Sequence, residues 1–184
     1  MTVRSQPRDR LVDAATRLFY REGLHTVGVD RLVAEASITR ATFYRHFPSK
    51  DDLVVAYLDR VDGDLREAVT AATAGVAPPN AVEALVGLIG RTVCSSGFRG
   101  CHFINAAAEY PDPAHSVRQA VERHRLWFRA TVTQLARAAG HPDPDYAGQA
   151  LSILHDGALV GGELDDPRTI SSTLERLVRE MFSQ

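Results

Sequence analysis

The chain has 184 residues, of which 45% are hydrophobic and 24% charged, so it can bury a core and is too apolar to be largely disordered. No apolar run approaches the ~18 residues that span a membrane, and no signal-type apolar stretch follows the polar residues 1–10. We therefore expect a cytoplasmic protein with no membrane partner. Two cysteines, Cys94 and Cys101, are too few for a disulfide framework.

The net charge of −2 is distributed unevenly. Residues 1–50 hold nine Lys or Arg and five Asp or Glu, a net charge of +4, whereas residues 51–184 hold 12 and 18, a net charge of −6. A basic N-terminal module on an acidic body is typical of a nucleic-acid reader with a separate ligand or dimer domain. Chance clustering of charges is the alternative.

Apolar residues recur with helical spacing along nearly the whole chain, which predicts an all-α protein with about nine helices and no strands. The first helix has one apolar face and a C-terminal stop at Gly23. That face consists of Leu11, Ala14, Ala15, Leu18 and Phe19. Two short helices are predicted next, at about 29–37 and 39–46.

The remaining helices are longer and have clear start signals. Ser49-Lys50-Asp51-Asp52 is similar to a capping box and predicts a fourth helix that runs to about Ala72. A fifth helix covers Val82 to Val93 and a sixth Cys101 to Tyr110. Asp-Pro pairs at 112–113, 143–144 and 166–167 each place an N-cap acceptor before a proline, and so predict the starts of the last three helices.

The two short helices and the Ser37-Ile38 turn between them form a predicted helix-turn-helix motif. Phe43 and Phe47 lie one helical turn apart and are expected in its core. Outward positions of the second short helix would then face a major groove, where base edges present a readable pattern. These outward residues are Arg40, Ala41, Thr42, Tyr44 and Arg45.

The segment 11–53, and above all ASITRATFYRHFPSKDDL at 36–53, resembles the DNA-binding domain of the TetR (tetracycline repressor) family. The resemblance implies a helix-turn-helix DNA-binding domain at 1–50 and a helical ligand-binding and dimerisation domain at 51–184. It also implies a sequence-specific transcriptional regulator, most often a repressor, that binds a near-palindromic double-stranded DNA operator as a homodimer. A small, largely apolar or aromatic ligand would release it, and no cofactor is implied.

The resemblance also assigns roles to individual residues. Tyr44 and Lys50 are similar to residues that anchor DNA phosphates, with the dipole of the fourth helix assisting, and His46 is similar to a second residue near the backbone. Thr39 and the base-reading positions Arg40, Ala41 and Thr42 complete the expected DNA contacts. Arg45 is either a backbone contact or a solvated charge.

Two positions depart from the family pattern. Ser37 stands where glycine is usual, so we expect a tight or strained turn. Gly28 stands where Ser or Thr usually caps the second helix; glycine caps nearly as well, but a hydroxyl contact to phosphate is lost unless Thr26 replaces it.

The resemblance further implies a small-molecule pocket enclosed by helices four to seven. Aromatic and polar residues on helices six to eight are the candidate ligand contacts, and each polar one is either a contact or a satisfied core residue. The candidates are Phe103, Asn105, His124, Trp127, Phe128, Thr131 and His155. On helices eight and nine, Gly157, Gly161 and a Leu/Val/Met stripe would form the dimer interface or cover the chain's own core.

Three alternatives compete with this interpretation. A redox-sensing regulator of the same fold would use Cys101 or Cys94 as an accessible thiolate, acidified by Arg99. An architectural DNA binder would have no ligand. An enzyme would need a catalytic motif, and we recognise no Ser-His-Asp order, phosphate-binding glycine loop or His-Glu-x-x-His pattern, so no catalytic or metal residue is predicted.

Overall fold

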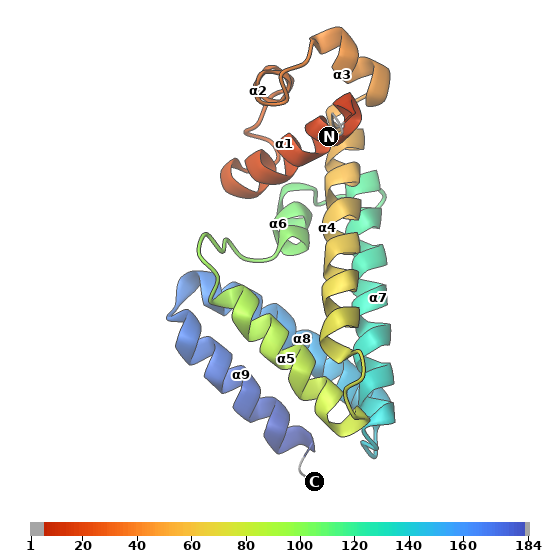
Figure 1. The fold of residues 1–184 in the computed structure, drawn as a ribbon, viewed down its shortest axis with the longest axis vertical. Coiled ribbons are helices and arrows are strands. Elements are labelled where there is room, and N and C mark those ends of the chain that lie inside the picture. Colours follow the sequence, from red (N-terminus) through yellow and green to blue (C-terminus); the bar gives the residue numbers. More distant parts are fainter. Residues whose placement is uncertain (1–5, 183–184) are drawn as a thin grey trace. The chain divides into compact units, whose positions relative to one another are not determined.

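The computed structural model describes residues 6–182, and within this range the chain forms nine α-helices and no strand (Figure 1). The predicted all-α fold is confirmed. None of the helices within this range is both long enough and apolar enough to cross a membrane. In chain order the helices are α1 Pro7–Glu22, α2 Val29–Glu35, α3 Arg40–His46, α4 Lys50–Thr73, α5 Pro78–Val93, α6 His102–Glu109, α7 Ser116–Ala138, α8 Pro144–Leu164 and α9 Pro167–Phe182.

The described residues divide into two compact units. The first contains residues 6–64 and 102–122, and the second contains residues 65–101 and 123–182. The boundaries fall inside α4 and α7, so neither helix belongs wholly to one unit. The predicted boundary at residue 50 separates a DNA-binding domain from a ligand-binding and dimerisation domain, and this division of functions stays a prediction.

The first unit has a core built around the apolar face of α1. All five residues predicted on that face are at most 5% exposed, and α1 packs on both α2 and α3. Phe43 and Phe47 are buried as predicted, at 0% and 3% exposure. Gly23 ends α1 with a φ of 92°, which a residue with a Cβ rarely adopts.

The turn between α2 and α3 depends on Ser37. Its φ of 51° is the only positive φ of a non-glycine residue within 6–182. The Ser37 amide donates to the Ala34 carbonyl at 3.1 Å and the Ile38 amide donates to the Val33 carbonyl at 3.0 Å, which closes the C-terminus of α2. The turn is tight, as expected, and its left-handed backbone at Ser37 is one that a residue with a Cβ adopts only at a steric cost.

A capping box starts α4, as predicted. The Asp52 carboxylate accepts from the Ser49 amide at 2.9 Å and from the Ser49 hydroxyl at 2.7 Å, while the Asp52 amide donates to Ser49 Oγ at 3.2 Å. These bonds satisfy backbone donors that the first turn of a helix leaves without intrahelical partners.

In the second unit, α9 packs against both α5 and α8 (Figure 1). The Asp-Pro starts of α8 and α9 are confirmed: Asp143 accepts from the Tyr146 amide at 3.0 Å, and Asp166 accepts from the Thr169 amide at 2.9 Å. The absent Cβ of Gly161 would lie 3.0 Å from the Ile170 side chain, so Gly161 brings α8 close to the chain's own α9.

The third Asp-Pro prediction is wrong. Asp112-Pro113 does not open α7, which begins at Ser116. The Asp112 carboxylate accepts from the Ala114 amide at 2.9 Å and its carbonyl accepts from the His115 amide at 3.1 Å, which makes a tight turn. An aspartate that bonds two residues ahead folds the chain into a turn, whereas a capping aspartate bonds three residues ahead.

Replacing Ser37 tests the strain in this turn. We expect Ser37→Gly to raise the free energy of unfolding by about 0.5 kcal/mol, because relief of the left-handed backbone exceeds the entropy that glycine adds to the unfolded chain. Ser37→Val should lower it by about 1 kcal/mol or more. Urea denaturation of both variants measures this, and equal stabilities would show that the turn is not strained.

Candidate nucleic-acid interface

One face of α3 is exposed while the opposite face is buried. Tyr44 has 44% of its surface exposed, Arg40, Ala41 and Arg45 are also exposed, and Phe43 is fully buried. The helix therefore presents short and cationic side chains on one surface and is fixed by aromatic packing on the other. A helix with such a surface has the dimensions and donors to enter a major groove.

Thr39 caps α3 and also orients Thr42. Its hydroxyl accepts from the Thr42 amide at 3.1 Å, and the two threonine hydroxyls share a hydrogen bond of 2.9 Å. The hydrogen bond with Thr39 fixes the orientation of the Thr42 side chain, whose methyl group can meet an apolar partner such as a thymine methyl.

Arg40 is held by contacts on both sides. Its Nη1 donates to Asp30 Oδ1 on α2 at 2.9 Å, and its guanidinium carbon lies 5.9 Å from the centre of the Tyr44 ring. A hydrogen bond with the Tyr44 side chain and then the negative charge of Asp30 raise the pKa of the Arg40 guanidinium. Arg40 is therefore a permanent cation with a restricted position.

His46 and Lys50 are less available than the sequence suggested. His46 is half-buried, and its Nε2 atom is buried without a hydrogen-bond partner among residues 6–182. The Lys50 ammonium donates to the Leu24 carbonyl at 2.9 Å and to the Val27 carbonyl at 3.3 Å. Lys50 thus fastens the start of α4 to the α1–α2 loop, and its contact with phosphate stays a prediction.

Glu109, at the end of α6, holds the same loop from another side. Its carboxylate accepts from the Leu24 amide at 2.8 Å and from the His25 amide at 2.7 Å. The next residue, Tyr110, donates from its hydroxyl to Asp51 on α4 at 2.7 Å. Glu109 could not be predicted from the sequence, because a single glutamate at the end of an apolar helix carries no local signal for a contact 85 residues away.

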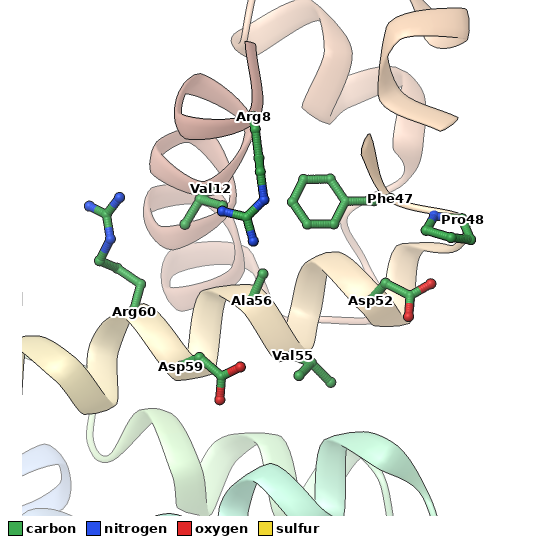
Figure 2. A pocket seen from close by; sticks show the side chains of 9 residues that line it. All are labelled: Arg8, Val12, Phe47, Pro48, Asp52, Val55, Ala56, Asp59 and Arg60. Atoms are coloured by element: carbon green, nitrogen blue, oxygen red, sulfur yellow. The ribbon is translucent and has the colours of Figure 1, made fainter. Parts of the chain in front are cut away.

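An open groove with a volume of about 500 Å³ lies between α1 and α4 of the first unit. Figure 2 shows the side chains that line it. The Arg8 guanidinium lies over the Phe47 ring at 5.3 Å from its centre, and so pins the start of α1 against the end of α3. The groove is lined by two arginines and two aspartates, so its lining has no net charge that would attract a charged ligand. It is lined by Arg8, Val12, Phe47, Pro48, Asp52, Val55, Ala56, Asp59 and Arg60.

Comparison with known proteins agrees with this geometry. The family model for bacterial regulatory proteins of the tetR family matches residues 11–57. The crystal structure of a TetR-family transcriptional regulator from Streptomyces coelicolor is similar along almost the whole chain, with a TM-score of 0.92 and 50% sequence identity over 96% of this chain and 94% of that one. The chain belongs to the TetR family of transcriptional regulators. It is a DNA-binding regulator and not an enzyme.

Two curated HTH-type regulators match shorter segments of the chain. An uncharacterized HTH-type transcriptional regulator of Mycobacterium tuberculosis is 35% identical over 71 residues, which are 39% of this chain and 35% of that protein. The HTH-type transcriptional activator FasR of Mycolicibacterium smegmatis is 35% identical over 57 residues, 31% of this chain and 26% of that protein. Each alignment spans about a third or less of the relative's length.

The predicted ligand contacts of this TetR-family chain are split between the units. Phe103 and Asn105 lie in the first unit, where Phe103 is buried, whereas Asn105 is exposed and so does not lie on an apolar face. The other five lie in the second unit. The five are His124, Trp127, Phe128, Thr131 and His155.

Four of these residues form an aromatic cluster, defined as His124, Trp127, Phe128 and His155. Ring centres are 5.6 Å apart for His124 and Trp127 and 4.2 Å apart for Phe128 and His155. His124 is 5% exposed, and the buried His155 Nδ1 lies 3.4 Å from Oδ1 of Asp156. Thr131 lies beside them, with its hydroxyl donating to the Trp127 carbonyl at 2.9 Å.

The cysteines do not support the redox alternative. A thiol switch needs an accessible thiolate, but Cys101 is only 9% exposed. Cys94 is exposed, with its thiol 3.5 Å from the Pro167 carbonyl. Over residues 6–182, no three potential His, Cys, Asp or Glu metal ligands come together.

His102, the first residue of α6, is enclosed by two tyrosines of the first unit. Its ring stacks on Tyr20 with centres 3.9 Å apart, and its Nδ1 shares a hydrogen bond of 2.5 Å with the buried Tyr57 hydroxyl. Burial lowers the pKa of His102 to about 4. A neutral imidazole therefore joins α1, α4 and α6 at neutral pH.

This lowered pKa predicts a specific acid sensitivity. Between pH 6.5 and 4 the unfolded chain binds a proton at His102 that the folded chain does not, so the free energy of unfolding should fall as the pH decreases through this window. We expect this fall to be about 2 kcal/mol smaller in His102→Gln than in the wild type. Urea denaturation at pH 7, 5.5 and 4.5 measures the difference, and parallel curves for the two proteins would contradict it.

Proposed function

We propose that this TetR-family regulator is a sequence-specific repressor that binds a near-palindromic operator as a homodimer and is released by a small apolar or aromatic ligand. The observation that carries the DNA-reading part is the exposed face of α3, where Arg40 and Thr42 are held in place before any DNA is bound. A restrained donor loses less entropy on binding than a free one. Arg40 is assigned to a guanine and Tyr44 to a phosphate.

These assignments predict different effects for two substitutions at α3. Arg40→Ala should relax base preference at one position of each half-site, at a cost of about 1–3 kcal/mol for the preferred base. Tyr44→Phe should weaken binding to selected and unrelated DNA by a similar factor, because a phosphate contact carries no sequence information. Selection from a random duplex library, followed by titration of selected and unrelated duplexes, measures both effects.

Arg137→Ala is the control for charge, since Arg137 is an exposed arginine of α7 in the second unit. If Arg40→Ala lowers the affinity for all sequences equally, its base-reading role is wrong. If the wild type enriches no sequence from the library, the proposed function itself fails.

The homodimer is supported by an exposed apolar face on α8 and α9. Five large apolar side chains there are between 42% and 75% exposed, beside a groove of about 800 Å³ between the two helices. These residues are Tyr146, Ile153, Val160, Leu164 and Leu177. The absent Cβ of Gly157 would meet nothing within 4 Å, so a partner helix could approach closely there. Exposed apolar side chains gathered on two neighbouring helices favour an interaction site.

A charge on this face should separate the subunits. We expect Leu177→Glu to sediment as a monomer at concentrations where the wild type is a dimer, and to lose operator affinity by at least about 100-fold, since the two half-sites then bind independently. The control is Leu126→Glu, because Leu126 is an α7 leucine with 50% exposure. A Leu177→Glu protein that stays dimeric, or a wild type that is monomeric and binds tightly, would refute this interface.

The proposed effector site is the aromatic cluster of the second unit. Its rings offer stacking and apolar contact to a ligand, while the Nδ1 atom of His155 already lies 3.4 Å from the Asp156 carboxylate. The Arg66 guanidinium covers the Trp127 ring at 4.5 Å from its centre. A ligand that binds here releases the operator only if it favours a conformation in which the two reading heads are wrongly spaced.

Trp127 is the chain's single tryptophan, so its fluorescence reports on this site. We expect planar aromatic compounds that restore transcription from an operator-bearing promoter in vitro to change the Trp127 emission as well. Trp127→Ala should shift their effective concentration by about 10-fold or more and leave DNA binding without ligand intact. If a compound releases the operator without changing the Trp127 emission, and Trp127→Ala responds to it as the wild type does, the ligand site lies elsewhere. If Trp127→Ala loses DNA binding without ligand, Trp127 is a core residue. Transcription that rises when the ligand-free protein is added would show an activator.

A further inference from the structure

Asp30 and Arg40 form an ion pair that crosses the helix-turn-helix motif. Asp30 lies in the first turn of α2, and its Oδ1 accepts from Arg40 Nη1 at 2.9 Å, at the start of α3. The pair is open to solvent, with 83% of the Asp30 side chain and 59% of the Arg40 side chain exposed. It lies beside the exposed face of α3 and includes Arg40, the residue to which the proposed function assigns base reading.

Stability of the fold does not account for this pair. An ion pair between exposed side chains contributes little to folding, because water competes for both charges and two long side chains must be ordered. The angle between α2 and α3 is already fixed by buried groups, among them Leu32 and Phe43, which are both 0% exposed. The ion pair is better explained by the role of Arg40 in binding DNA.

An arginine that reads guanine has to present its planar guanidinium edge-on to two acceptors. A free arginine side chain explores many rotamers, and it can also turn to a phosphate and give up base selectivity. In this chain Asp30 holds Nη1 from one side and the Tyr44 ring lies under the guanidinium at 5.9 Å. The guanidinium has five N–H donors, so engaging Nη1 with Asp30 leaves donors to address a base. In a groove from which water is excluded, the attraction between Asp30 and Arg40 strengthens.

We propose that Asp30 is a specificity-determining positioning residue, which aims Arg40 at a base and keeps it from the phosphates. The inference rests on the proposed base-reading role of Arg40. Asp30 itself touches no base in this account and acts through Arg40.

The test compares the wild type with Asp30→Ala in selection from a random duplex library, followed by titration of the selected duplex and its single-base variants. We expect Asp30→Ala to reduce the preference for guanine over the other bases about fivefold at one position of each half-site, and to leave affinity for unrelated DNA equal or higher. Asp30→Glu should restore most of the preference. In an Arg40→Ala background, Asp30→Ala should have no further effect on base preference.

The matched control is Glu35→Ala. Glu35 lies at the other end of α2 and pairs with Arg17 of α1 at 3.1 Å, so this substitution removes an exposed ion pair that does not involve Arg40. Thermal unfolding should be nearly unchanged in both variants, which separates a binding effect from a folding effect.

Two results would overturn the inference alone: an unchanged base preference in Asp30→Ala, or an equal gain in affinity for all DNA, which would make Asp30 only a competitor for Arg40. If Arg40→Ala keeps the guanine preference, both the base-reading role of Arg40 and this inference are wrong.

Discussion

The geometry of the reading head depends on how the short loop between α1 and α2 is held. Two charged side chains from distant parts of the sequence satisfy its backbone: Lys50 donates to the carbonyls of Leu24 and Val27, and Glu109 accepts from the amides of Leu24 and His25. Hydrogen bonds to charged groups are stronger than those between neutral groups. Because α2 follows this loop directly, the position of the whole helix-turn-helix relative to α4 and α6 within the first unit is set here.

On this fixed base, the α3 face is restrained one side chain at a time. Thr39 holds Thr42, and Asp30 holds Arg40, each at about 2.9 Å. On the opposite face of α3, the fully buried Phe43 packs the helix into the core of the first unit. The result is a surface on which the groups that would read bases are ordered before binding, so that less binding energy is lost in ordering them. The ordered polar groups on this surface are the part of the fold that fits a DNA-binding role.

The sequence predicted what depends on local patterns. The apolar face of α1, the tight turn at Ser37, the capping box at Ser49 and two of three Asp-Pro helix starts follow from residues a few positions apart, and all were found. The helix start predicted at Asp112-Pro113 was wrong because the carboxylate of an aspartate can accept either from a helix N-terminus or from an amide within a turn. Long-range partners carry no such pattern: nothing near Glu109 points to a loop 85 residues earlier, nor anything near Lys50 to carbonyls in the same loop. The sequence predicted Lys50 as a cation at the interface, but only the fold shows which carbonyls its ammonium binds.

The measurement closest to this account is amide hydrogen exchange of Leu24 and His25 in the wild type and in Glu109→Gln, a change that keeps the side chain's size and removes its charge. If the loop is held as described, these two amides should exchange about 10-fold faster or more in the variant, while the buried amides of α1 exchange as before and affinity for DNA falls on all sequences. Unchanged protection of Leu24 and His25 in Glu109→Gln would contradict the account, because the carboxylate would then not be what positions the reading head.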